Sequence, residues 1–439
     1  MVFLLNLLII LAALHMPFSG AYSAEHTKAQ PVPKGKGIFV KVHHGRSQTD
    51  LAGLIQNPYI AGASDHFFWS ELEPREGEYH WEILEEFMAP WAKVNKKVVL
   101  ALGTAGKLKW GKNPYARYGT PEWVFQKGVR KMEIPGKTSI YPNYWDQGYQ
   151  QALKKFLSAL AKKYDGDPRI EFIRIGGYSA GSEPNLSGDD RRELMGQWTA
   201  AGFDGFTAGG VYSQAIRSIM DIWSNSFNKT PLAASIHFSW KGGFEEELNK
   251  HTVAKRFILL NNGLSVRTQA PSRQAFKDYH KRGLKTGWGG LGHYALLEEK
   301  PSSKKGRKEQ GEGANRRGKR RHQEDQGEQD YALLEEQPSA TKGRREKGEQ
   351  ANRRRGRRHQ EVQGEQDLNM VKKEEQAMKL FQHAIGDESQ PELSPKSHVS
   401  YILLHENVVR SATPNTPHYS TKYEAAIRYA SEHLEPRGR

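Results

Sequence analysis

Short apolar stretches and amphipathic stretches alternate along most of the chain. The apolar stretches are rich in β-branched and aromatic residues, which predicts strands. The stretches between several of them carry apolar residues three and four positions apart, which predicts helices. The eight predicted strands lie at 37–44, 60–69, 96–105, 169–177, 231–238, 256–263, 284–292 and 398–409.

The clearest helix is predicted over residues 146–164. Asp146 can cap its start, and Asp165 followed by Gly166 can end it. Its apolar residues form one stripe, which we expect to pack on a sheet. The stripe consists of Tyr149, Leu153, Phe156, Leu157, Leu160, Ala161 and Tyr164.

A last helix is predicted at 421–434, where Thr421 and Glu424 have the spacing of a capping box. Strands that alternate with helices indicate parallel βαβ units. Eight such units indicate a closed (β/α)8 TIM barrel rather than an open sheet.

One long segment breaks this alternation after the seventh predicted strand. Residues 294–330 and 331–367 are tandem copies of one charged unit, with 28 of 37 positions identical. Two polar copies have no apolar face on which to stack, so we expect a low-complexity insertion that is disordered or loosely helical. The barrel would then be built from 37–293 and 368–439.

The amino-terminal residues read as a targeting segment. Residues 3–16 are almost all apolar but too few for a comfortable membrane span, and small residues follow, among them Ala21 and Ser23. We therefore expect a signal peptide at 1–23, a linker at 24–36 and a secreted or periplasmic protein without a transmembrane segment after cleavage. The alternative is an uncleaved anchor helix.

Composition narrows the choice of partners. The 439 residues carry a formal charge of +15, which permits anionic partners, and the hydrophobic share of 37% is low mainly because of the repeat. The arginine clusters of the repeat lack interleaved aromatic residues, so we do not expect a nucleic-acid partner. The chain has no cysteine and no HExxH-type spacing, and we expect neither a metal nor another cofactor.

The segment 67–82, "FFWSELEPREGEYHWE", places Trp69 and Glu71 at the end of the second predicted strand. A turn with Glu-Pro and Gly77 follows, and then an aromatic pair that leads into a helix. This run resembles the clan A glycoside hydrolases, especially the β-galactosidase-like TIM barrels. The resemblance extends by pattern over about 37–292 and 368–435, and it implies hydrolysis of a glycosidic bond.

The fourth predicted strand is followed by a glycine-rich turn, in "IRIGGYSAGSEPNL" at 173–186. In the clan the acid/base glutamate follows this strand, usually as Asn-Glu-Pro. The resemblance therefore implies that Glu183 is the general acid, a role that suits a half-buried carboxyl whose pKa is raised towards neutrality. In the clan the asparagine would bind a sugar hydroxyl next to the reaction centre. Ser182 replaces it here and is shorter, so the resemblance does not carry this contact over. The alternative is a turn glutamate that caps the next helix.

A retaining glycosidase needs a second carboxylate about 5 Å from the first. In the clan this residue ends the seventh strand, where the insertion begins in this chain. The candidates are Glu298, Glu299 and Glu365. Glu406 ends the eighth predicted strand and is a candidate only if the strand count is one too high.

Aromatic residues at strand ends are typical of sugar sites, because indoles stack on the C–H faces of sugar rings. Trp69, Trp240 and Trp288 all lie at predicted strand ends, and His66 and His237 could hydrogen-bond to hydroxyls. Each tryptophan could instead pack between the barrel and its helices.

The sequence thus predicts a hydrolase of an oligo- or polysaccharide that works by double displacement, with a carbohydrate as its partner. One alternative is a barrel that binds glycans without cleaving them, since the second carboxylate is not evident. A third interpretation is a basic surface adaptor whose working part is the repeat.

Overall fold

The computed structural model describes residues 37–44, 48–105, 119–133, 140–178, 188–235, 243–261, 270–291, 377–382, 384–386, 398–416 and 419–435. The predicted signal peptide, the linker and the tandem repeat lie outside these residues.

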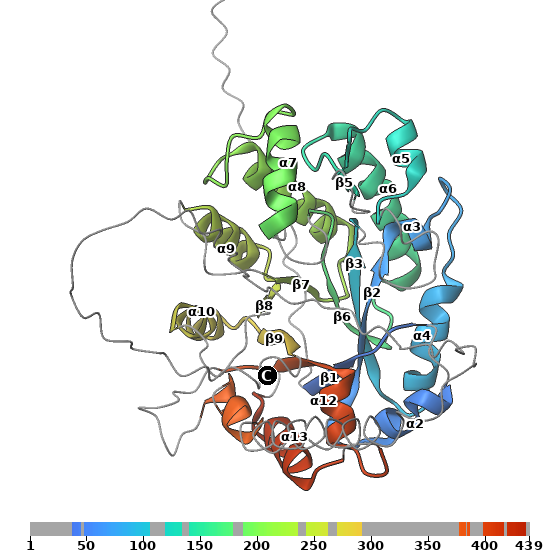
Figure 1. The fold of residues 1–439 in the computed structure, drawn as a ribbon, viewed down its shortest axis with the longest axis vertical. Coiled ribbons are helices and arrows are strands. Elements are labelled where there is room, and N and C mark those ends of the chain that lie inside the picture. The colour runs from blue at the N-terminus through green and yellow to red at the C-terminus, as the bar shows by residue number, and fades with distance from the viewer. Residues whose placement is uncertain are drawn as a thin grey trace, which may run out of the picture.

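Eight parallel strands close into a barrel, in the order β1-β10-β9-β8-β7-β6-β3-β2 (Figure 1). Each strand falls within one of the eight segments predicted from the sequence, so the (β/α)8 TIM barrel is confirmed. The strands are β1 (Gly37–Lys41), β2 (Ile60–Phe68), β3 (Lys97–Gly103), β6 (Ile170–Arg174), β7 (Leu232–Ser235), β8 (Ile258–Asn261), β9 (Thr286–Leu291) and β10 (Tyr401–His405). A separate antiparallel pair is formed by β4 (Lys131–Glu133) and β5 (Ile140–Pro142).

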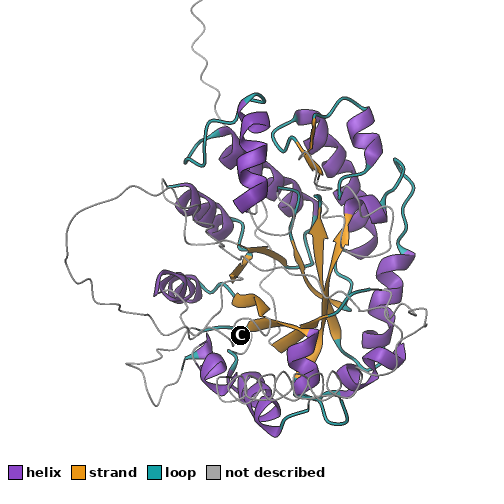
Figure 2. Cartoon of the chain, viewed as in Figure 1, coloured by secondary structure: helices purple, strands orange, loops and turns teal. Residues whose placement is uncertain are grey.

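Helices surround the strands (Figure 2). Their bounds are α2 (Gln48–Gln56), α3 (Trp69–Leu72), α4 (Glu82–Ala92), α5 (Glu122–Gln126), α6 (Gln147–Tyr164), α7 (Gly188–Thr199), α8 (Val211–Ser226), α9 (Phe244–Ala254), α10 (Ala270–Lys281), α12 (Glu406–Ser411) and α13 (Thr421–His433). Within the described ranges, none of these helices combines the length and the apolar character needed to cross a bilayer.

Most strand residues are apolar on both faces of the sheet, because each face meets a different core. Alternate residues pack against the helices in a large outer cluster. The others fill the barrel axis in a smaller cluster of Phe39, Val99, Phe172, Ala233, Ile258, Leu260, Tyr401 and Leu403. This double burial is expected for a parallel sheet covered by helices.

Helix α6 shows how the sequence sets an element and its ends. All seven residues of the predicted stripe are buried. The Asp146 side chain accepts a hydrogen bond from the Tyr149 backbone N–H, and Gly166 adopts a φ of 89° just after the helix. These are the predicted start and end.

The start of α13 differs from the prediction by one residue. Ser420, not Thr421, is the N-cap, and its hydroxyl accepts from the Lys422 backbone N–H at 3.2 Å. Ser420 has the extended backbone of a cap, whereas Thr421 is already helical, so the capping-box spacing predicted from Thr421 and Glu424 starts one residue too late.

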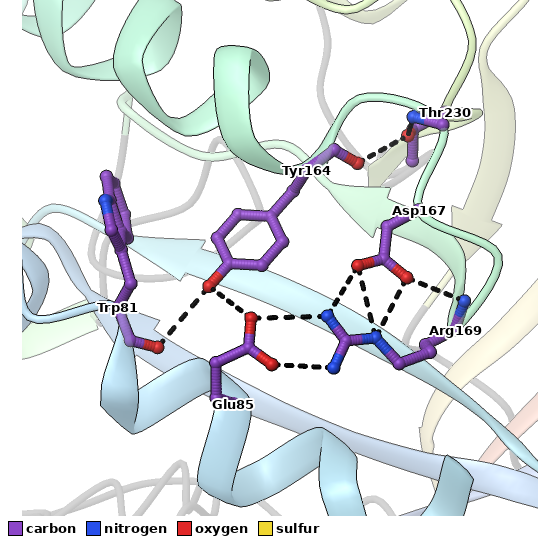
Figure 3. Close-up of polar contacts among 7 residues, drawn as sticks. Trp81, Glu85, Tyr164, Asp167, Arg169 and Thr230 are labelled. Carbon is purple, nitrogen blue, oxygen red and sulfur yellow. Dashed lines mark hydrogen bonds and ion pairs between the residues drawn. The ribbon is translucent and has the colours of Figure 1, made fainter.

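A polar network at the amino end of β6 ties the barrel to two helices (Figure 3). Arg169 forms a two-pronged ion pair with Glu85 of α4, at 2.6 and 3.2 Å, and a second with Asp167. The hydroxyl of Tyr164, the last residue of α6, donates to Glu85 at 3.1 Å. The network therefore fixes the end of the barrel away from the carboxyl ends of the strands.

Candidate active site

Function in TIM barrels is concentrated at the carboxyl ends of the strands, where the βα loops meet. Three described regions reach this end: the ends of β1 and β2, the segment 176–178 that follows β6 (the exit of β6), and the strands β9 and β10. Glu183, His237 and Trp240, which follow the fourth and fifth barrel strands in the sequence, lie outside the described residues. The same holds for Glu298, Glu299 and Glu365.

The junction between β2 and α3 contains Trp69, the tryptophan of the segment that resembles the clan A glycoside hydrolases. Trp69 is fully buried, and its indole N–H donates to the Glu73 carboxylate at 2.7 Å. Its ring stacks on Phe156 of α6 at a centroid distance of 5.5 Å. Glu73 also accepts from the Gly77 backbone N–H at 2.9 Å, so it closes the turn that follows. The Trp and Glu-Pro residues therefore hold the corner together, and the indole presents no open face for a sugar.

Glu71 is likewise buried, and its carboxylate accepts from the Phe68 backbone N–H at 2.9 Å. Its other oxygen lies 3.5 Å from the imidazole of His44, which follows β1. Glu71 thus joins the ends of β1 and β2.

His44 is held between two buried carboxylates. Its Nδ1 lies 2.6 Å from Asp65, and its backbone N–H donates to the same oxygen. Burial lowers the pKa of His44, but hydrogen bonds to Asp65 and Glu71 outweigh burial and raise it to about 10. Burial raises the pKa of Asp65, yet the bonds from His43 and His44 leave it well below its ordinary value. His44 is therefore a fixed cation at neutral pH, suited to positioning and unsuited to taking up a proton.

The exit of β6 is held by three hydrogen bonds to three successive backbone carbonyls. Trp223 donates to Gly176 at 2.9 Å, Tyr149 to Gly177 at 2.7 Å, and Tyr212 to Tyr178 at 2.6 Å. All three donor side chains are fully buried on α6 and α8. This segment leads directly to the loop that carries Glu183, so the donors fix the point from which that loop starts.

The last of these regions contains Trp288 on β9 and Glu406 after β10. Trp288 is fully buried against Phe276 of α10, and its indole N–H donates to the Ala384 carbonyl at 3.1 Å. It therefore packs between barrel and helices and offers no open face. Glu406 begins α12 after the eighth barrel strand, and its carboxylate accepts from Arg410 at 2.6 Å. The strand count is eight, so the condition under which Glu406 would match the clan nucleophile is not met.

The three carbonyl-binding donors could not be identified from the sequence, because each lies far along the chain from its acceptor. Another strand-end group is visible in the sequence: the cationic Arg174 ends β6, two residues after Phe172. Among the described residues, no cluster of three or more His, Asp or Glu side chains could hold a metal ion.

Comparison with known proteins agrees with the family resemblance of the segment 67–82. Residues 50–228 match the model of a glycoside hydrolase family described as β-galactosidase. A search of curated proteins finds no match. The match and the closed barrel confirm the resemblance to a clan A glycosidase TIM barrel, and they support a glycoside hydrolase with a carbohydrate substrate.

Several solved structures are also similar at low identity. Xylanase B from Clostridium stercorarium F9 is 13% identical over 84% of this chain and 86% of its own, with a TM-score of 0.42. The catalytic domain of β-amylase from Paenibacillus polymyxa is 13% identical over 59% of this chain and 88% of its own, with a TM-score of 0.41. A Thermobacillus composti GH10 xylanase is 14% identical over 58% and 68%, with a TM-score of 0.35.

Proposed function

We propose that the protein hydrolyses glycosidic bonds in an oligo- or polysaccharide, with Glu183 as general acid and base. The observation that carries the proposal is the β-galactosidase family match over 50–228, which includes both the Trp69 signature and Glu183. The firmly held exit of β6 supports it further, since catalytic groups must be placed within a fraction of an ångström.

In the proposed reaction, Glu183 protonates the glycosidic oxygen while a second carboxylate attacks the anomeric carbon. The bond to the leaving sugar breaks, and a covalent glycosyl–enzyme forms. Glu183 then takes a proton from water, which displaces the enzyme carboxylate with overall retention. We assign the nucleophile to the segment after β9, with Glu298, Glu299 and Glu365 as candidates. We further propose that the chain is exported, in keeping with its predicted signal peptide.

The test is the Glu183→Gln variant, which cannot donate a proton at neutral pH. Hydrolysis of a sugar–sugar linkage should fall by about 10²–10⁴-fold. Hydrolysis of an aryl glycoside with a good leaving group should fall less, because departure of that group needs little protonation. Glu246→Gln, an identical change on the exposed surface of α9, is the control.

Equal activity of Glu183→Gln and parent on both substrates would contradict the assignment of Glu183 as general acid.

A parent protein that binds glycans but releases no reducing sugar from any of them would favour the non-catalytic binding barrel. The anomeric configuration of the first product, followed by NMR, tests retention.

A further inference from the structure

Tyr212, the second residue of α8, contacts three parts of the chain: the exit of β6, α7 and α9. Its side chain is fully buried, and its hydroxyl donates to the Tyr178 carbonyl at 2.6 Å. Tyr178 is the last described residue before the segment 179–187, which contains Glu183. The hydroxyl therefore holds the residue from which that segment begins.

The ring of Tyr212 contacts the helices that follow two segments. It stacks on Phe244, the first residue of α9, at a centroid distance of 5.9 Å and an interplanar angle of 9°. Phe244 comes soon after the segment 236–242, which follows β7 and contains His237 and Trp240. The ring also lies 5.1 Å from that of Trp198 on α7, the helix that follows the segment 179–187.

A polar contact next to this stack ties the start of α9 to the start of α8. The Glu247 carboxylate accepts from the Ser213 hydroxyl and from the Gly209 backbone N–H, both at 2.6 Å. It also pairs with Arg217 at 3.1 Å. The first turns of the two helices are therefore held together, with the Tyr212 and Phe244 rings buried between them.

The other two donors at the exit of β6 make different ring contacts. The Trp223 ring stacks on Phe227, just beyond the end of its own helix, at 5.5 Å. The Tyr149 ring lies edge-on to Trp69 of α3 at 6.1 Å. Of the three described donors, Tyr212 is thus the one whose ring reaches the helices after both segments.

The chemistry of the Tyr212 hydroxyl suits a positional role. Burial raises the pKa of Tyr212 well above its ordinary value, so the hydroxyl stays protonated at neutral pH. It can therefore donate to the Tyr178 carbonyl throughout a reaction cycle and takes no part in proton transfer itself.

We propose that Tyr212 is a positioning residue that holds the acid segment 179–187 and the sugar-binding segment 236–242 in one fixed relation. Its hydroxyl sets where the Glu183 segment begins, and its ring sets where the segment with His237 and Trp240 ends. This inference rests on the proposed function, because it assigns the two segments their roles in hydrolysis.

The hydroxyl is tested by Tyr212→Phe, which removes one oxygen and keeps the ring on Phe244. We expect kcat/KM for a sugar–sugar linkage to fall about tenfold, because Glu183 is displaced from the glycosidic oxygen. For an aryl glycoside with a good leaving group, kcat/KM should fall less than about twofold, since that group departs with little protonation.

Tyr164→Phe is the matched control for the hydroxyl. Tyr164 is equally buried, but its hydroxyl donates to Glu85 at 3.1 Å at the amino end of β6. Its loss should lower stability and leave the ratio of the two kcat/KM values unchanged.

The ring contact is tested by Phe244→Leu, which removes the stack and keeps the Tyr212 hydroxyl. We expect kcat/KM to fall about fivefold on both substrates alike, mainly through a higher KM, because sugar binding weakens equally for both. Phe257→Leu is the control, since Phe257 is equally buried but lies before the start of β8. It should leave KM unchanged.

Hydrogen exchange of the full-length protein gives a readout that needs no activity. Tyr212→Phe should speed exchange in peptides over 176–187, and Phe244→Leu in peptides over 236–246. Neither Tyr164→Phe nor Phe257→Leu should change exchange in these peptides.

The inference is overturned if Tyr212→Phe lowers kcat/KM equally on both substrates, or if exchange in the two segments is the same in the variants and their controls. Neither result would touch the proposed hydrolysis, which the activity of the parent decides. A parent that cleaves no glycan, together with the expected exchange pattern, would overturn the hydrolysis and uphold the anchoring of both segments by Tyr212.

Discussion

The Tyr149 hydroxyl donates a 2.7 Å hydrogen bond to the Gly177 carbonyl, just after the fourth barrel strand. Gly177 has a φ of 106°, and a Cβ there would lie 2.8 Å from the Leu153 side chain of the same helix α6. The backbone at Gly177 therefore takes a conformation that favours glycine, and α6 contacts it through both Tyr149 and Leu153. Because the loop that carries Glu183 starts here, α6 acts on that loop through a single buried hydroxyl.

We predict that Tyr149→Phe lowers the free energy of unfolding by about 1–3 kcal/mol, because a buried carbonyl loses its donor. We also expect kcat to fall about tenfold with KM little changed, since a displaced acid affects the transition state more than binding. Thermal unfolding and steady-state kinetics measure the two effects.

The matched control is Tyr279→Phe. Tyr279 is also buried, and its hydroxyl donates to a backbone carbonyl, that of Asn249, at 3.2 Å between α10 and α9. Its loss should lower stability without lowering kcat. If both variants reduce kcat equally, the Tyr149 bond has only a general structural effect.

His44 makes stability depend on pH in a definite direction. Its pKa rises from an ordinary 6.5 to about 10 on folding, so its contribution is fully present below pH 6.5 and is lost as the pH rises towards 10. The pKa of Asp65 falls on folding, so its contribution is present above about pH 3.8 and is lost in more acidic solution. We expect the His44–Asp65 pair to contribute most to the free energy of unfolding between about pH 3.8 and pH 6.5.

We predict that His44→Gln costs roughly 3–5 kcal/mol at pH 6, the cost of removing one partner of a buried ion pair. The difference from the parent should shrink between pH 7 and 10, as measured by urea unfolding at each pH. His80→Gln removes a histidine whose partner, Glu78, lies at the surface, and should cost little at any pH. A His44→Gln deficit that stays constant to pH 10 would contradict the assignment of charge.

The backbones of β2 and β3 approach each other closely at Gly62, and a substitution there tests this contact. A Cβ at this position would lie 1.6 Å from the Lys97 carbonyl oxygen, which is backbone and cannot move aside alone. We predict that Gly62→Ala destabilises the barrel by more than about 3 kcal/mol, within the range for severe core defects. Gly196→Ala is the control: nothing lies within 4 Å of its added Cβ on α7, and it should stabilise by about 0.5–1 kcal/mol. Chemical denaturation measures both.

The sequence predicted the barrel well because strands and helices are local patterns. Eight apolar segments sufficed to fix the count, and Asp146 and Gly166 marked the ends of α6 correctly. The role of Trp69 was harder to predict, since an indole at a strand end can face either a ligand or a helix. Its burial depends on Phe156, which lies almost ninety positions further along the chain. Long-range contacts of this kind also explain why His44 and Tyr149 were not among the predicted site residues.

Glu406 provides a test of the strand assignment. It follows the eighth strand and lies 2.6 Å from Arg410 one turn along α12, where a carboxylate at the helix start is also favoured by the helix dipole. We predict that Glu406→Gln lowers the free energy of unfolding by about 0.5–1 kcal/mol and leaves glycosidase activity within twofold. Glu298, Glu299 and Glu365 are each changed to Gln in a separate variant. We expect at least one of these three variants to lose activity by several orders of magnitude. Azide should restore turnover in the corresponding Ala variant, because a small anion can replace a missing nucleophile. If azide instead rescues Glu406→Ala, the nucleophile follows the eighth strand, and the site differs from the clan pattern.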